Sequence, residues 1–258
     1  MQNINWNPLT YAQASDIQFW QAMEALTILN LKGDERILDL GCGDGKITAL
    51  LADKVPKGEV VGIDITPEMI EFSKDKFDAI SNLSFELLSA DNLSYIEEFD
   101  YVVSFSCLHW IKNQKSVWQG IFKALKPGGQ VIAGFQSDHE HLWDAIVEVI
   151  SKSEWKNLFS GFQDPYNHYS LKAMQGYIQS AGFYLARADE IHQVESLKSV
   201  GALKNFLQNW VPQFRFLEDD KAALFVDEVI GNYMSKIDPV IRQQAGIRIK
   251  RFIFHAIK

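Results

Sequence analysis

Short apolar runs alternate with amphipathic patterns along the first half of the chain. Runs typical of buried strands occupy residues 36–40, 60–64, 83–88, 101–105 and 130–135. Between them, 3.6-residue periodicity predicts helices that begin near residues 46, 67 and 116. Strands that alternate with helices indicate a parallel sheet with helices on both faces. The pattern therefore predicts an α/β, doubly wound fold, which binds ligands at the carboxyl ends of its strands.

The second half of the chain breaks this alternation. The pattern predicts helices at 141–152 and 171–181, a strand at 183–194, helical segments across 197–237 and a last strand at 247–257. No Pro-, Gly- or Ser-rich linker separates an independent domain, so we expect one domain over residues 1–258. In it, residues 35–135 form the cofactor-binding half. Helices within 1–30, with Phe19, Met23, Leu26 and Leu29 on one face, and segments 137–182 and 195–246 are expected to form a lid.

Composition narrows the possible partners. Of 258 residues, 25 are Lys or Arg and 33 are Asp or Glu, giving a net charge of −8. Nucleic acids and anionic membranes are held by clustered positive charge, so neither is expected as a partner. The two cysteines, Cys42 and Cys107, make no disulfide scaffold, and no signal peptide or apolar membrane span is visible. We expect a cytoplasmic protein, monomeric or homodimeric.

A glycine-rich loop follows the first strand, in the order Asp39-Leu40-Gly41-Cys42-Gly43-Asp44-Gly45-Lys46. Glycines at this junction let a ligand approach the backbone, and the next helix presents free N–H groups. Asp64 ends the second strand, where an acid can bind both hydroxyls of a ribose. The dinucleotide fingerprint requires glycine where Lys46 stands, which disfavours an NAD-dependent dehydrogenase.

The loop D-x-G-x-G-x-G instead resembles that of class I S-adenosylmethionine-dependent methyltransferases. Asp91, after the third strand, and the turn Leu125-Lys126-Pro127-Gly128-Gly129 also match that family, so the resemblance covers about residues 35–135. It implies a Rossmann-like seven-stranded sheet in the order 3-2-1-4-5-7-6, with the seventh strand antiparallel. It also implies S-adenosyl-L-methionine as cofactor.

The same resemblance implies a set of cofactor-binding residues. By this resemblance, Asp64 is expected to bind the ribose and Asp91 to lie near the adenine amino group. The set is Tyr11, Asp39, Gly41, Gly43, Gly45, Asp64, Ile65, Met69, Ala90, Asp91, Asn92 and Ser106. Each acid could instead be an ordinary turn residue, and the glycines could form only a tight turn.

Two further motifs resemble small-molecule carboxyl methyltransferases. Trp6-Asn7-Pro8-x-x-Tyr11 is similar to the start of trans-aconitate methyltransferases. Tyr11 and Gln18, together with Ser106-Cys107-Leu108-His109-Trp110, are similar to juvenile-hormone acid methyltransferases. The resemblance implies that Gln18 and Trp110 orient an acceptor carboxylate, which would be converted to a methyl ester. Malonyl-carrier-protein methyltransferases share this layout.

Other interpretations of these residues remain open. Ser15-Asp16-Ile17-Gln18 also matches a capping box, and Tyr11 and Trp110 could be core aromatics. His109 could act as general base if the acceptor were a hydroxyl, amine or carbon. A protein that binds the cofactor without catalysis is the least favoured reading.

Two charged stretches lie outside the motifs. Asp138-His139-Glu140-His141 lacks a third ligand at metal-binding spacing and is explained as a polar helix start, so no metal is expected. The basic run near the end of the chain forms either a solvated face or a contact to an anionic substrate. Its residues are Arg242, Arg248, Lys250 and Arg251, and Arg215, in an aromatic stretch of the expected lid, is the other candidate for that contact.

Overall fold

A computed structural model describes residues 8–139 and 141–258. The chain divides into two compact units. Among the described residues, 8–135, 169–190 and 252–258 form the first, here called the sheet unit. Residues 136–139, 141–168 and 191–251 form the second, here called the helical unit.

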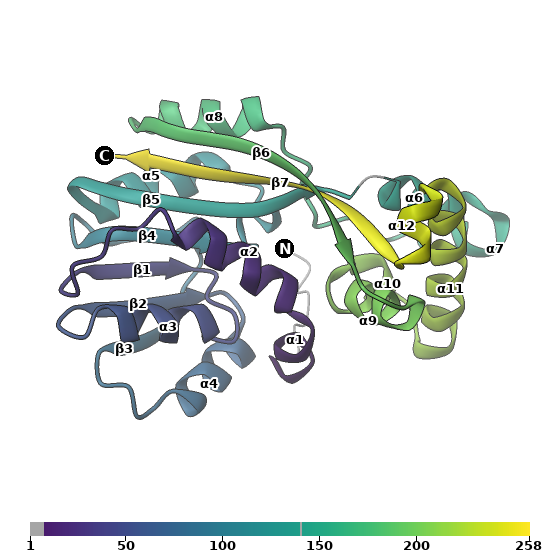
Figure 1. Cartoon of the computed structure of the whole chain (residues 1–258), viewed down its shortest axis with the longest axis horizontal. Coiled ribbons are helices and arrows are strands. Elements are labelled where there is room, and N and C mark those ends of the chain that lie inside the picture. Colours follow the sequence, from purple (N-terminus) through teal and green to yellow (C-terminus); the bar gives the residue numbers. More distant parts are fainter. Residues whose placement is uncertain (1–7, 140) are drawn as a thin grey trace. The chain divides into compact units, whose positions relative to one another are not determined.

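The sheet has seven strands in the order β3-β2-β1-β4-β5-β7-β6 (Figure 1). They are β1 (Arg36–Leu40), β2 (Glu59–Asp64), β3 (Leu83–Leu87), β4 (Phe99–Phe105), β5 (Leu125–Asp138), β6 (Tyr184–Ser196) and β7 (Gly246–Ile257). The first five are paired in parallel. Backbone bonds join Gly128 and Gly129, near the start of β5, to Lys258 after β7, so β7 runs antiparallel to β5. The predicted fold class and strand order are confirmed.

Helices of the sheet unit pack on the strands and on one another. They are α1 (Pro8–Ala14), α2 (Asp16–Leu26), α3 (Lys46–Lys54), α4 (Pro67–Lys76), α5 (Gln114–Ala124) and α8 (Leu171–Ser180), with the 3-10 turn η1 (Leu108–Trp110). Helices α3 and α4 contact β2 and β3, and α5 contacts α8. The core under α5 and α8 centres on fully buried Trp118, which meets Phe183 and Phe254 edge to face. Burial of this apolar surface holds the strand ends in place for the site.

The expected N-terminal helices are present, with a narrower buried face than predicted. In α2, Ala22, Ala25 and Leu26 are buried, whereas Phe19 and Met23 are only half-buried. Trp6 and Asn7, part of one predicted motif, lie outside the described residues.

The helical unit contains the remaining helices. They are α6 (Leu142–Ser151), α7 (Ser153–Lys156), α9 (Val200–Trp210), α10 (Pro212–Phe216), α11 (Asp219–Lys236) and α12 (Pro239–Gln243). Helix α6 packs along α11, which also contacts α9 and α10. Segment 137–182, expected as one lid segment, is divided between the units, because α8 contributes Met174 and Ile178 to the core of the sheet unit.

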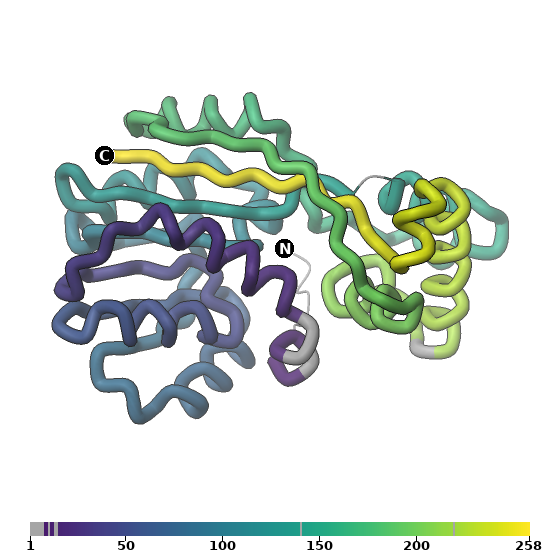
Figure 2. The backbone as a smooth tube through the Cα atoms, in the orientation of Figure 1, coloured from purple at the N-terminus to yellow at the C-terminus, as the bar shows by residue number. Residues whose placement is uncertain are grey.

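Several element boundaries differ from the predictions. Strand β5 begins at Leu125 rather than residue 130, because the Pro-Gly-Gly turn pairs with the chain end. Helix α6 begins at Leu142, since His141 has a φ of +63°. Within the described part of the chain, no helix is long and apolar enough to cross a membrane. The backbone trace in Figure 2 follows these elements in chain order.

Candidate cofactor and acceptor site

The glycine loop follows β1 with three glycines in the left-handed region. Gly41, Gly43 and Gly45 have φ values of +73°, +53° and +74°. At Gly41 an added Cβ would lie 2.6 Å from Cys107 Cβ and would overlap its sulfur. The N–H groups of Gly41 and Cys42 donate to the Ile63 carbonyl at 2.8 and 3.0 Å. The loop is thus fixed between β2 and Cys107, two residues after the end of β4, and only glycine satisfies position 41.

The backbone is closely packed at Gly45, the residue just before α3. An added Cβ there would lie 2.8 Å from Phe85 Cζ and 2.9 Å from Ser73 Oγ. Lys46 is the first residue of α3, and its side chain turns aside. Its Nζ lies 4.1 Å from the Phe19 ring centroid and 3.9 Å from Asp16 Oδ1. The glycine that permits close approach therefore stands one residue earlier than the dinucleotide fingerprint requires.

Asp39 lies in β1 and is almost fully buried, with 2% of its surface exposed. Its Oδ2 accepts the Thr48 hydroxyl at 2.8 Å. Burial raises the pKa of Asp39 to about 7; the Thr48 bond opposes this shift, and the charges of Asp64 and Asp44 add to it. A buried carboxylate poised near neutrality gains from a nearby cation, so this position suits a positively charged ligand.

Asp64 ends β2 and ties the loop to the start of α4. Its Oδ2 accepts the Gly43 N–H at 3.0 Å and its Oδ1 accepts the Thr66 N–H at 2.9 Å. Burial raises its pKa, against the effect of these backbone bonds. Thr66 is the N-cap residue of α4, but its side chain forms no capping bond, and Asp64 binds the Thr66 N–H instead. The Thr66 hydroxyl also bonds to this carboxylate, and the acceptor sites that remain can take ribose hydroxyls.

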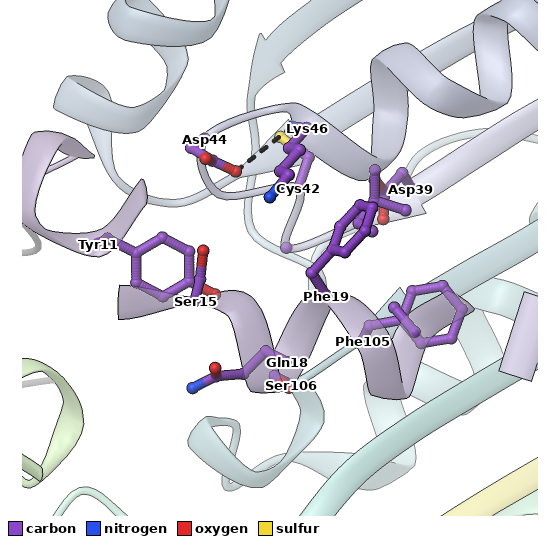
Figure 3. A pocket seen from close by; sticks show the side chains of 13 residues that line it. Tyr11, Ser15, Gln18, Phe19, Asp39, Cys42, Asp44, Lys46, Phe105 and Ser106 are labelled. Atoms are coloured by element: carbon purple, nitrogen blue, oxygen red, sulfur yellow. Dashed lines mark hydrogen bonds between the residues drawn. The ribbon is translucent and has the colours of Figure 1, made fainter. Parts of the chain in front are cut away.

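A pocket lies over this loop, between the two N-terminal helices and the ends of β1 and β4 (Figure 3). Its lining residues include Tyr11, Ser15, Gln18, Phe19, Asp39, Gly41, Cys42, Asp44, Lys46, Phe105 and Ser106. Tyr11 covers the loop, since an added Cβ at Gly43 would lie 3.6 Å from its ring. Burial and the charges of Asp44 and Asp64 raise the pKa of Tyr11, so its phenol stays neutral. The structure thus brings five predicted residues, Tyr11, Gln18, Asp39, Gly41 and Ser106, to one pocket.

Gln18 does not form the capping hydrogen bond that the pattern Ser15-Asp16-Ile17-Gln18 allowed. Ser15 is the N-cap residue of α2, but its side chain forms no capping bond. The Gln18 Oε1 is buried and has no hydrogen-bond partner in the described part of the chain. The capping-box interpretation is therefore wrong for these residues, and the amide is available at the pocket.

The segment after β4 carries the other predicted acceptor residues. Ser106 has a φ of +51°, an uncommon value for a residue with a side chain, and lines the pocket. His109 is 4% exposed, with its ring 4.8 Å from that of Trp110 and 5.8 Å from that of Phe135. Trp110 is half-buried. Neither His109 nor Trp110 is among the residues that line this pocket.

The remaining predicted cofactor residues flank the ends of β2 and β3. Met69 and Ala90 are buried, while Ile65 is 55% exposed. Asp91 is half-buried and accepts the Ser89 hydroxyl at 2.5 Å, and Asn92 is exposed. An exposed apolar side chain next to Asp64 could cover a flat aromatic base.

Asp138, His139 and His141 directly precede α6, as the sequence suggested, but His139 is not a solvated residue. His139 is fully buried, its Nε2 is 2.7 Å from Gln136 Oε1, and its ring centroid is 4.5 Å from that of Trp210. Burial lowers its pKa to about 3, so the ring is neutral. Glu140 lies outside the described residues, and within 8–139 and 141–258 no three potential ligands are grouped for a metal.

The basic residues of the helical unit have individual roles. Arg251 is buried and donates to Gln193 Oε1 at 2.8 Å, and Lys250 pairs with Asp138 at 3.7 Å. Arg242 donates to the carbonyls of Ser235 and Ile237, at the end of α11. Arg215 lies exposed on α10, and Arg248 is half-buried in β7. A single solvated basic face does not describe this set.

Asp44 is a site residue to which the sequence analysis gave no role. It lines the pocket, is 5% exposed and leaves one carboxylate oxygen without a partner. Its place between two glycines of the loop was the available signal. The pattern D-x-G-x-G-x-G fixes the acid at Asp39 and leaves position 44 open, so the pattern alone does not single out Asp44.

Comparison with known proteins places the chain in a family. The family model described as "Methyltransferase domain" matches residues 31–163, just over half of the chain. Protein 235L of Invertebrate iridescent virus 6, provisionally classed as a methyltransferase, is 27% identical over 91% of this chain and 88% of its own length. Juvenile hormone acid O-methyltransferase of Bombyx mori is 32% identical over 52% of this chain and 50% of its own. Trans-aconitate 2-methyltransferase of Methylobacterium radiotolerans is 31% identical over 48% and 47%. The aligned parts thus span about half of these two enzymes.

Solved structures agree in fold. A provisionally assigned methyltransferase from Bacillus halodurans superposes with a TM-score of 0.63 at 18% identity, over 92% of this chain and 97% of the other. A phosphoethanolamine N-methyltransferase from Haemonchus contortus, solved with S-adenosylhomocysteine, gives a TM-score of 0.61 at 18% identity, over 100% and 59%. With the family match, the strand order and the glycine loop in agreement, the chain belongs to the methyltransferase-domain family and is a class I S-adenosylmethionine-dependent methyltransferase.

Proposed function

We propose that this enzyme transfers a methyl group from S-adenosylmethionine to a small-molecule carboxylate, giving a methyl ester. The observation that carries the proposal is the Gln18 amide, which lines the pocket beside Tyr11 and Asp39 and is not held by a capping bond through its oxygen, so its N–H₂ group can donate to an acid. Two relatives, by their names, methylate acids. The two cysteines, both free thiols, support a reducing, cytoplasmic location, and the proposed enzyme is a monomer or a homodimer.

A carboxylate acceptor fits a site that needs no general base. S-adenosylmethionine supplies an activated methyl group on a sulfonium. A carboxylate is ionised at pH 7, so the protein only has to bind it, orient one oxygen and exclude water. The Gln18 amide is a neutral donor at the pocket and would orient the acid without pairing fully with its charge. The Trp110 indole N–H is the second donor of the proposal, and it would have to turn toward the pocket, which it does not line in this structure. An arginine would also stabilise the ground state, which does not raise the rate.

The proposal assigns the loop and its acids to the cofactor. Asp64, next to Gly43, would accept the ribose hydroxyls, and Asp39 would face the positive end of the cofactor. Asp91 and Ile65 would border the adenine. These residues fit the group, because the pocket lies over the glycine loop and a nearby positive charge would stabilise the buried carboxylate of Asp39.

The main alternative is a hydroxyl, amine or carbon acceptor with His109 as base. A base must reach the acceptor's proton, within about 3 Å or through one water. His109 is instead buried against Trp110 and Phe135, which favours a packing role. A carrier-protein-bound acid is the second alternative, since one relative is a malonyl-carrier-protein methyltransferase.

The acceptor class is tested by release of S-adenosylhomocysteine. Small carboxylic acids, acyl-carrier-protein thioesters and hydroxylated aromatics are supplied in parallel, and the methylated product is identified by mass. Turnover confined to hydroxylated aromatics, with loss of activity in His109→Ala, would overturn the carboxylate proposal.

Variants of Gln18 and Trp110 test the binding mode once an acid is found. Trp110→Phe keeps the ring and removes the N–H, so kcat/KM should fall about tenfold to a hundredfold with cofactor affinity unchanged. Gln18→Ala should behave alike, and Gln18→Glu should be worse because it repels the acid. If Gln18 only stabilised α2, Gln18→Glu would be harmless to turnover, and Gln18→Ala would lower mainly the melting temperature.

A further inference from the structure

Lys46 stands at a position where its own helix gains nothing from a positive charge. It is the first residue of α3, and the rest of that first turn, Ile47-Thr48-Ala49, is uncharged. The amino end of a helix carries a partial positive charge, so a lysine there is unfavourable. The side chain reaches across to α2, where its Nζ lies 4.1 Å from the centroid of the Phe19 ring and 3.9 Å from Asp16 Oδ1. The contact therefore joins two walls of the pocket, since both Lys46 and Phe19 line it (Figure 3).

The first half of α2, which meets Lys46, is less firmly packed than the second half. Residues 16–21 are half-buried or exposed. The buried residues of α2 all follow them and are Ala22, Ala25 and Leu26. The N-cap residue Ser15 forms no side-chain capping bond, so the first turn lacks that usual stabilisation. This is nevertheless the half that carries Gln18 to the pocket, so its position depends on side-chain contacts such as that of Phe19 with Lys46.

The ring contact is the stronger of these two contacts of Lys46. The Asp16 side chain is 78% exposed, and an ion pair of 3.9 Å at such a site is screened by water and contributes little. The ammonium group lies well inside the distance of about 6 Å at which an aromatic face attracts a cation. At a partly exposed site such a contact shifts an equilibrium about twofold to fivefold. The hold of Lys46 on α2 therefore acts mainly through the Phe19 ring.

We propose that Lys46 is a positioning residue, which holds the first half of α2 against the pocket through the Phe19 ring, and that the cofactor enters and leaves when this contact breaks. The lining residues come from α1 and α2 on one side and from β1, the glycine loop and the end of β4 on the other. Movement of α2 therefore opens the pocket. The contact is made by protein groups alone, so it slows entry and exit alike and leaves the affinity unchanged. The inference rests on the cofactor class and is independent of the acceptor.

The test is Lys46→Gln, which removes the charge and keeps part of the aliphatic stem. Stopped-flow fluorescence gives the association and dissociation rate constants of S-adenosylhomocysteine. We expect both rate constants to rise about twofold to fivefold, with an unchanged dissociation constant. Hydrogen exchange of the protein without ligand gives a second readout. The amides of residues 16–21 should exchange faster by the same factor, while those of residues 22–26 keep their rates.

Three further variants isolate the contact. Lys46→Arg keeps a cation that can lie over the ring and should behave as the parent protein does. Phe19→Leu should speed the exchange of residues 16–21 as Lys46→Gln does, and the double variant should add nothing further. Lys54→Gln is the matched control, because it removes the same charge from the exposed end of α3 and should leave rate constants and exchange unchanged.

Four outcomes would overturn the proposal. A weaker affinity for S-adenosylhomocysteine, with an unchanged association rate constant, would make Lys46 a residue that contacts the cofactor. Additive effects of Lys46→Gln and Phe19→Leu would mean that the lysine does not act through this ring. Unchanged rate constants and exchange would leave α2 independent of Lys46. A Lys46→Gln variant that does not fold would also contradict the proposal, because losing a cation at the start of α3 should leave the melting temperature equal or higher.

Discussion

Cofactor binding should weaken below neutral pH because Asp39 takes up a proton there. Burial of its carboxyl is the main reason that its pKa lies at about 7, and the charges of Asp64 and Asp44 raise it further. At pH 8 the side chain is a carboxylate, which in the proposed binding mode faces a cationic ligand. At pH 6, about nine molecules in ten carry a neutral acid, which attracts that ligand far less.

The size and sign of the effect follow from proton linkage. S-adenosylmethionine carries a net positive charge, so its binding stabilises the ionised form and lowers the pKa of Asp39 in the complex. Below pH 7, binding then releases a proton, and affinity falls about tenfold per pH unit. The limit is a return of the pKa to its ordinary value of 3.8, which is about 4 kcal/mol for about three units.

Calorimetry in two buffers of different ionisation enthalpy measures the dissociation constant of the cofactor and the number of protons released on binding. We expect a dissociation constant about tenfold higher at pH 6 than at pH 8, with nearly one proton released per cofactor at pH 6. Asp39→Asn is the control, because it cannot ionise and reports the titration of the cofactor and of other groups. If the parent protein and Asp39→Asn showed the same pH dependence, Asp39 would not face the positive charge of the cofactor.

Further perturbations test folding and loop geometry. Between about pH 4 and pH 7, folded Asp39 keeps a proton that the unfolded chain loses, so the free energy of unfolding should fall as pH rises; urea titrations should show less of this fall in Asp39→Asn. Asp64→Ala should weaken cofactor binding by about 1.5–3 kcal/mol in calorimetry, and an unchanged affinity would remove Asp64 from the ribose. Gly41→Ala should lower the melting temperature by several degrees, because its Cβ would overlap Cys107; Gly41→Ala with Cys107→Gly should recover part of that loss, and no recovery would contradict the clash.

The sheet was predictable because its signals are local. Strand β1 was predicted with the observed bounds, and β2 and β3 within one residue at each end, since buried parallel strands have continuous apolar runs between turn signals. The start of β5 was missed because Pro127-Gly128-Gly129 is typical of a turn. Pairing of that segment with the end of the chain is a long-range effect that no window reveals.

The candidate site was predictable in its backbone and less so in its side chains. Glycine spacing identified the loop, because positive φ values at close intervals require glycine. The role of Gln18 could not be decided from S-x-x-Q, since the capping pattern occurs whether or not the bond forms. His139 looked like a surface residue among charges, and its burial against Trp210 depends on a helix about 70 positions later in the chain.

The place of the closely packed glycine bears on how this loop could acquire another cofactor. Gly45 already fits against Phe85 and Ser73, so a close approach of the backbone lies just before Lys46, the first residue of α3. Lys46→Gly would give the chain the sequence G-x-G-x-x-G of the dinucleotide fingerprint, but the close contact of Gly45 with Phe85 and Ser73 would stay where it is. A change to NAD would require the loop to be lengthened by one residue and α3 to be rotated by about 100°, one residue's share of a helical turn. Point substitutions alone would not achieve this, so cofactor choice in this chain is protected by the spacing of the backbone rather than by any single side chain.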